Sequence, residues 1–120
     1  ARTDGMWETD EQLLPTRRVR PPACPDFSAG AALAGSDLDN CFTGLDGSAL
    51  MTWTDGRPSV RLSSPDSRFL QVYTRGDDGS FCVEAQSSMP DAFNRPDDDS
   101  GLILIPPGGR TNHRTTIGRA

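Results

Sequence analysis

The sequence has little apolar material and no long hydrophobic run. Only 34% of its 120 residues are hydrophobic and 7% are aromatic, so a single domain of this length would bury a small core. No apolar stretch approaches the ~20 residues of a membrane-spanning helix, and the amino terminus lacks the hydrophobic centre of a signal peptide. We therefore expect a soluble, cytoplasmic protein that does not bind a membrane.

Basic residues, cysteine and histidine are also scarce. Twelve basic residues against 17 acidic ones give a net charge of −5, which does not favour binding to nucleic acid. Cys24, Cys41 and Cys82 are odd in number and lack zinc-ligand spacing, which indicates reduced thiols. His113 is the one histidine, so a metal site with two histidines is excluded, and a surface or strand-end position is favoured for it. No phosphate-binding or cofactor-binding motif occurs, so we expect no cofactor.

One acidic run could suggest a cation. Residues 97–99 are three aspartates in succession, but they lack the alternating ligand spacing and the terminal glutamate of a calcium-binding loop. A solvated acidic loop is the favoured interpretation, and no metal is expected.

The chain divides into two parts that differ in their sequence pattern. Residues 1–37 show little periodicity and contain Pro21, Pro22 and Pro25, which predicts an irregular lead-in with at most one short helix or strand. A helix over residues 9–14 is conceivable, with Thr9 as its cap.

Residues 38–120 show short runs of β-forming residues separated by turn signals, which predict the carboxyl-terminal strands of a β-sandwich domain. The candidate strands are residues 40–45, 49–54, 59–63, 68–74, 80–85, 102–105 and 114–117. Asp55-Gly56 predicts a hairpin with a type I′ turn. Residues 102–105 are apolar at four successive positions, which predicts a strand buried on both faces. We expect that strand to pack against a missing segment or a second subunit.

Glu84 is unusual because it interrupts an apolar run that begins at residue 81. Burying an ionised carboxylate costs several kcal/mol unless it is paired. The residue therefore either points to solvent on a polar face, which is the commoner case, or is held in an apolar surround for proton transfer.

Several motifs, taken together, resemble the aldose 1-epimerase (galactose mutarotase) family, in its carboxyl-terminal portion. Cys82-Val83-Glu84-Ala85-Gln86 and then Pro90-Asp91-Ala92-Phe93-Asn94 are similar to that family's signature. Leu38-Asp39-Asn40-Cys41-Phe42 and Val72-Tyr73-Thr74 agree in the same order, as do Leu14-Pro15-Thr16, Asp26-Phe27 and Pro107-Gly108.

The resemblance implies an all-β fold, the antiparallel galactose mutarotase-like supersandwich, of which this chain would be the last part. It implies interconversion of the α and β anomers of free aldoses by acid and base ring opening. Glu84 would be the catalytic base, and Asp39 would bind a hydroxyl of the sugar. The family's acid is a histidine from the preceding part of the domain, and His113 does not match it, so the isolated chain should have low activity. The alternatives are a non-catalytic carbohydrate-binding β-sandwich module and an inactive fragment.

Overall fold

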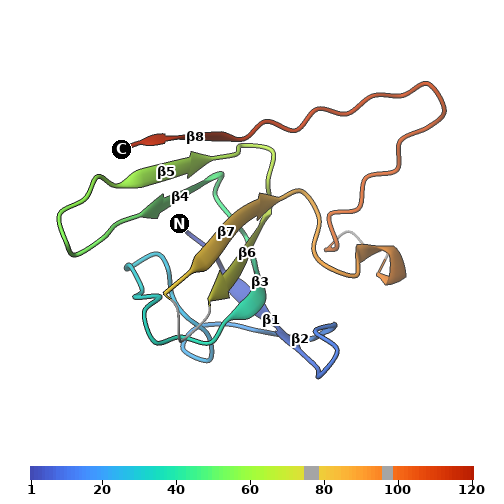
Figure 1. Ribbon diagram of the computed structural model, residues 1–120. Coiled ribbons are helices and arrows are strands. Elements are labelled where there is room, and N and C mark those ends of the chain that lie inside the picture. The colour runs from blue at the N-terminus through green and yellow to red at the C-terminus, as the bar shows by residue number, and fades with distance from the viewer. Residues whose placement is uncertain (75–78, 96–98) are drawn as a thin grey trace.

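The computed structural model describes residues 1–74, 79–95 and 99–120. It contains two antiparallel sheets and one short 3₁₀ helix, η1 (Ala92–Asn94) (Figure 1). The five-stranded sheet has the order β2-β1-β3-β6-β7 and the three-stranded sheet the order β4-β5-β8. The predicted all-β antiparallel sandwich is confirmed.

The strand bounds follow the runs of β-forming residues. They are β1 (Gly5–Thr9), β2 (Pro15–Val19), β3 (Asp39–Thr43), β4 (Ser48–Met51), β5 (Val60–Ser63), β6 (Phe69–Thr74), β7 (Phe81–Gln86) and β8 (Thr116–Arg119).

The main core lies between the two sheets. Phe42, Leu70 and Val72 point from one face of the five-stranded sheet, and Ala49 and Leu62 meet them from the three-stranded sheet. Phe42 is completely buried, and its ring centroid lies 4.7 Å from that of Phe27. This packing fixes which face of β3, β6 and β7 is turned away from the core, because successive side chains of a strand point to opposite faces.

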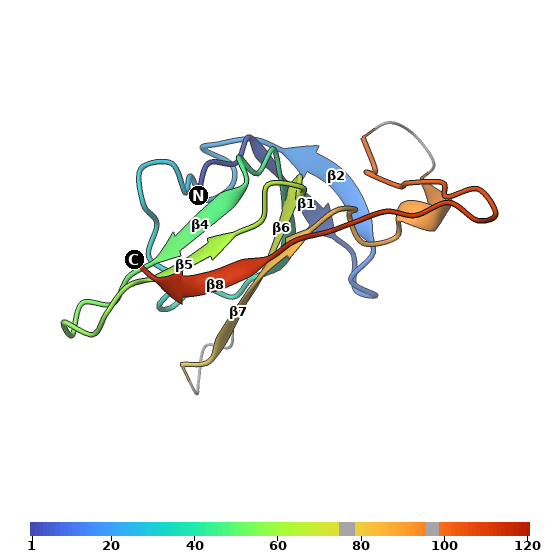
Figure 2. The ribbon, with the colours of Figure 1, turned by 90° about the horizontal axis from the view of Figure 1, so that it is seen from above.

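The second face of the five-stranded sheet is covered at one end only. Cys41 and Phe69 pack there against Met89 and Ala92, and Leu102 joins them at the edge of the cluster. The chain after η1 then runs away from both sheets before it returns to form β8 (Figures 1 and 2). Polar side chains lie beside this cluster on the same face, where Gln71 pairs with Cys41 and Gln86 pairs with Phe69.

The lead-in is more regular than its sequence suggests. Residues 1–37 hold two strands, β1 and β2, where at most one element was expected, and β1 also pairs with β3. A turn replaces the conceivable helix over residues 9–14: the Asp10 carboxylate accepts hydrogen bonds of 2.9 Å from the backbone N–H groups of Gln12 and Leu14. Tertiary pairing with β3 supplies the stability that the charged strands lack on their own.

The prediction of a strand over residues 102–105 is wrong, whereas their expected packing against a missing segment or a second subunit stays a prediction. These residues form no strand, and Leu104 is 88% exposed. A continuous apolar run predicts two-sided burial only where a partner surface exists, and the described part of the chain offers none beyond Leu102.

The hairpin predicted at Asp55-Gly56 does join β4 to β5, which pair antiparallel. However, only Gly56 has a positive φ, of 81°, so the turn is not of type I′, which requires positive φ at both central positions. In the described ranges no helix is long and apolar enough to cross a lipid bilayer.

Candidate functional site

Four polar side chains lie on the face of the five-stranded sheet opposite the main core, beside the cluster of Cys41 and Phe69. They are Asp39 on β3, Gln71 on β6, and Glu84 and Gln86 on β7, and we call them the polar strip. The β6–β7 register places Gln71 directly opposite Glu84, and the β3–β6 register places Asp39 opposite Tyr73, two residues along β6 from Gln71. Directly paired residues share a face, as do residues two apart, so all four belong to one surface.

Asp39 is tied to the centre of the strip. Its Oδ1 atom accepts a hydrogen bond of 2.8 Å from Nε2 of Gln71, and both side chains are half-buried. Asp39 is the first residue of β3, so one side of its carboxylate lies at the end of the sheet. The carboxylate is thereby held in one orientation and keeps acceptor capacity for a ligand.

Glu84 faces solvent on the polar face of β7. Its neighbours Val83 and Ala85 pack against the main core on the opposite face, while Glu84 is exposed and accepts a hydrogen bond of 3.3 Å from Nε2 of Gln86. The expectation of an apolar surround is therefore wrong, because strand alternation separates the carboxylate from the apolar residues beside it. Glu84 is open to a ligand approaching from outside.

Gln71 is the residue that the sequence analysis missed. Its Nε2 atom is occupied by Asp39, whereas its Oε1 atom is buried and has no hydrogen-bond partner within the described residues. An unpaired buried carbonyl costs about 1–3 kcal/mol, which a bound hydroxyl group would recover. Only the pairing of β6 with both β3 and β7 brings Gln71 between two carboxylates.

The strip offers the groups that a polyhydroxylated ligand needs. Carboxylates and amides follow one another across three strands spaced about 5 Å apart, and hydroxyl groups both donate and accept hydrogen bonds. Asp39 and Glu84 stand on either side of Gln71, so a small ring lying over Gln71 would meet both carboxylates.

His113 lies elsewhere. Its Nε2 atom is 2.8 Å from Oγ of Ser67 and 3.4 Å from Oγ of Ser64, both in the turn between β5 and β6. The side chain is exposed and lies shortly before β8, which agrees with the strand-end position favoured for it. Among the described residues, His113 makes no hydrogen bond to the polar strip, so it supplies no acid there.

The three cysteines are all unpaired. Cys24 and Cys41 are buried and Cys82 is exposed. Burial raises the pKa of the Cys41 thiol to about 12. Cys82 lies opposite Tyr73 and two residues before Glu84, on the face of the polar strip.

Metal binding finds no support in the part of the chain that the structure describes, where no group of three histidine, cysteine, aspartate or glutamate side chains could hold an ion. Asp97 and Asp98, for which a solvated loop was favoured, lie outside the described residues, and Asp99 is exposed.

The sequence profile of the family described as aldose 1-epimerase matches residues 1–118. No curated protein and no solved structure matches the chain significantly. Because the profile covers nearly the whole chain, and the two sheets are those expected of the fold, this protein belongs to the aldose 1-epimerase family.

Proposed function

We propose that this chain supplies the base and a sugar-orienting carboxylate of an aldose 1-epimerase that interconverts the α and β anomers of free aldoses of the glucose and galactose type. The observation that carries the proposal is the placement of Asp39 and Glu84 on one open sheet face, on either side of Gln71. Family membership makes an epimerase the coarse expectation. The reaction, anomerisation, and the substrates, free aldoses, are our proposal.

In the proposed mechanism Glu84 removes the proton of the anomeric hydroxyl group. The electrons of that O–H bond form the carbonyl at C1, the bond between C1 and the ring oxygen breaks, and an acid delivers a proton to that oxygen. Rotation about C1–C2 and closure on the other face, with both proton transfers reversed, give the other anomer. An exposed carboxylate suits this role because the substrate must reach it directly.

Asp39 fixes the sugar in position while the ring opens. Its carboxylate accepts a hydrogen bond from a sugar hydroxyl, and the 2.8 Å bond from Gln71 holds it in place. Oε1 of Gln71 accepts a hydrogen bond from a second sugar hydroxyl and so gains the partner that it lacks within the described chain. Restricting the ring in this way lowers the entropic part of the barrier.

The acid comes, in our proposal, from another part of the domain or from a second subunit. His113 is engaged with Ser67, away from the strip. Exposed apolar side chains at Ile103, Leu104 and Ile117 offer a surface that such a partner would cover. We further propose a cytoplasmic location and a role in carbohydrate metabolism, since three unpaired thiols fit a reducing compartment.

A non-catalytic carbohydrate-binding module is the second candidate. The observation that favours it is that no histidine among the described residues lies in the polar strip to act as the acid. A module of this kind would use Asp39 and Gln71 for binding and would leave Glu84 without a role in proton transfer.

Polarimetry and calorimetry together separate the two candidates. Freshly dissolved α-galactose and α-glucose are followed with and without the protein, and binding of each sugar is measured on the same preparation. Mutarotation faster than in buffer supports the epimerase. Binding without acceleration supports the module, and neither binding nor acceleration excludes both.

A further inference from the structure

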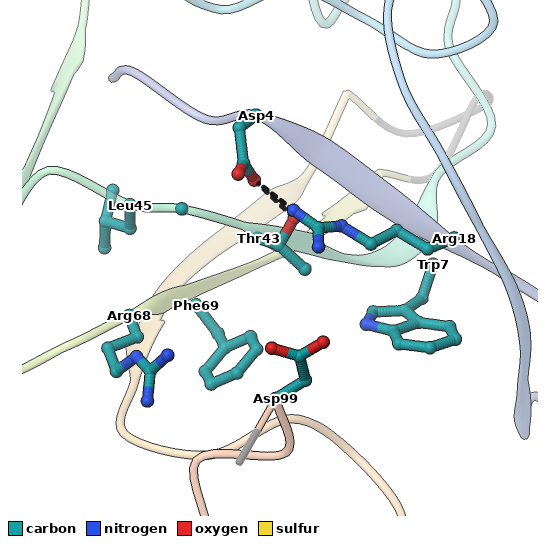
Figure 3. A pocket seen from close by; sticks show the side chains of 9 residues that line it. Asp4, Trp7, Arg18, Thr43, Leu45, Arg68, Phe69 and Asp99 are labelled. Atoms are coloured by element: carbon teal, nitrogen blue, oxygen red, sulfur yellow. Dashed lines mark hydrogen bonds and ion pairs between the residues drawn. The ribbon is translucent and has the colours of Figure 1, made fainter. Parts of the chain in front are cut away.

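A polar pocket lies at the covered end of the sheet face that carries the polar strip. It has a volume of about 260 Å³, and Trp7, Arg18, Thr43, Phe69, Asp4 and Asp99 are among its lining residues (Figure 3). Phe69 lines this pocket and lies directly opposite Gln86 of the polar strip, but none of the four residues of the strip lines the pocket. The pocket and the strip are therefore separate features of one surface.

Two N–H donors in this pocket have no acceptor. Nε1 of Trp7 and Nε of Arg18 are both buried and make no hydrogen bond to any described residue. The edge of the Trp7 indole that carries its nitrogen is turned toward Asp99 (Figure 3). Burying an N–H donor without an acceptor is unfavourable, so two such donors beside one cavity indicate that a ligand or ordered water accepts their hydrogen bonds.

The fold holds Arg18 and Asp4 over the pocket. Nη2 of Arg18 lies 2.8 Å from Oδ1 of Asp4, which also accepts a hydrogen bond of 2.6 Å from Thr43. Burial raises the pKa of Asp4, but the hydrogen bonds from Thr43 and Arg18 outweigh it and lower the pKa overall, which keeps this carboxylate ionised. Arg18 is thus fixed by one end of its guanidinium group while Nε remains available.

Two glycines make the space for this pair. A Cβ atom on Gly5 would lie 2.7 Å from the backbone oxygen of Val19 and 3.1 Å from Nε of Arg18. A Cβ atom on Gly44 would lie 2.5 Å from Oδ1 of Asp4, and Gly44 also has a positive φ of 72°. Any other residue at these positions would displace the side chains that shape the pocket.

The charges around the pocket decide the class of ligand. Arg18 and Arg68 are balanced by Asp4 and Asp99, so an anion would meet two carboxylates and a cation two guanidinium groups. A neutral ligand avoids both costs. Hydroxyl groups can accept from Trp7 and Arg18 and donate to the carboxylates, whereas an aliphatic ligand could do neither. The volume is below the ~300–1,000 Å³ of drug-sized sites, so the ligand is small.

We propose that this pocket is a second binding site for a small, neutral, hydroxyl-rich molecule such as a single sugar ring. The site is distinct from the polar strip and does not depend on proton transfer by Glu84. It therefore goes beyond the proposed epimerase function, and an experiment can refute either proposal without refuting the other.

Fluorescence offers a direct test, because the chain has two tryptophans. Trp53 lies on the loop after β4, near Phe81 and Arg57 and away from the pocket. In a Trp53→Phe variant the emission therefore reports on Trp7 alone. The probe is methyl β-galactoside, whose ring cannot open, so the signal does not depend on turnover. We expect a saturable change in Trp7 emission, retained when Glu84→Gln is added.

Two substitutions give the matched comparison. Trp7→Phe keeps an aromatic ring and removes the N–H donor, and Arg18→Lys keeps the charge beside Asp4 and removes Nε. Loss of one hydrogen bond should weaken binding of the probe about fivefold, measured by calorimetry, whereas Trp53→Phe should leave it unchanged. The proposal is overturned if Trp7 emission does not respond, if Trp7→Phe binds as well as the parent protein, or if acetate binds in preference to the glycoside.

Discussion

The side-chain amide of Gln71 joins β6 to β3 by donating a hydrogen bond of 2.8 Å to the carboxylate of Asp39. The same side chain lies directly opposite Glu84 on the next strand. Gln71 thus connects, through the sheet register, two carboxylates that are 45 residues apart in the chain (84 − 39). This arrangement makes Gln71 a positioning residue for the proposed reaction.

Replacing Gln71 with leucine should weaken the protein's action on sugars without unfolding it. The change removes the bond that orients Asp39 and the acceptor offered by Oε1, so we expect kcat/KM for galactose to fall about tenfold, mostly through a higher KM. Gln12→Leu, in the exposed turn before β2, is the matched control. If Gln71→Leu matches Gln12→Leu in KM and kcat, then Gln71 takes no part.

Cys82 should be the one thiol that reacts quickly with N-ethylmaleimide in the native protein, because Cys24 and Cys41 are buried. It lies two residues before Glu84 on the same face, so the added group should block sugar from the polar strip. We expect one equivalent of label by mass spectrometry and a parallel loss of sugar binding. Cys82→Ser should protect binding from the reagent, and labelling that leaves binding intact would place the sugar elsewhere.

Stability should decline at alkaline pH because of Cys41. Its pKa is raised by burial from 9.0 to about 12, so the native state holds a proton that the unfolded state loses first. The stabilisation is complete below about pH 9 and is lost as the pH rises from 9 toward 12, by about 1 kcal/mol per unit. Urea unfolding between pH 8 and pH 11 measures this slope. Cys41→Ala should reduce it, and an identical slope in the variant would assign the effect to other groups.

Gly5→Ala should destabilise the protein by about 1–3 kcal/mol. The added methyl group would lie 2.7 Å from the backbone oxygen of Val19 and 3.1 Å from Nε of Arg18, so β2 and the Arg18 side chain must both move. Gly118→Ala in β8 is the control, because its Cβ would meet nothing within 4 Å. Thermal unfolding of both variants gives the comparison. Equal stability of the two variants would show that β2 shifts to accommodate the methyl group without loss of stability.

Much of the fold could be predicted from local pattern. The runs of β-forming residues and the turn signals between them predicted β3, β4, β5, β6 and β7 nearly where they occur. At most one element was expected over residues 1–37, and the pairing of β1 with β2 was missed because charged residues interrupt the apolar pattern. The ion pairs of Arg17 with Glu8 and of Arg18 with Asp4 join residues that are far apart in the sequence. The error at residues 102–105 has the opposite cause, since an apolar run does not specify the surface that would cover it.

The candidate site was predicted in part, through the motifs around Asp39 and Glu84. Neither motif indicates that the two side chains share a face with Gln71 between them, because that depends on the register of β3 and β7 against β6. Of the two interpretations of Glu84, the position facing solvent is correct and the apolar surround is wrong. Val83 and Ala85 surround it in sequence, but the pleat sends them to the core. Pairing register is a long-range property that a single sequence does not display.

The most direct test of the proposed function compares Glu84→Gln with Glu11→Gln. Both changes remove one negative charge and keep the size of the side chain, but Glu11 lies in the exposed turn between β1 and β2. The rate of α-galactose mutarotation is followed by polarimetry for the two variants and the parent protein. We predict that Glu84→Gln loses at least a hundredfold of the acceleration, as expected for removal of a general base, while Glu11→Gln retains it. Full acceleration by Glu84→Gln would contradict the assignment of Glu84 as the base.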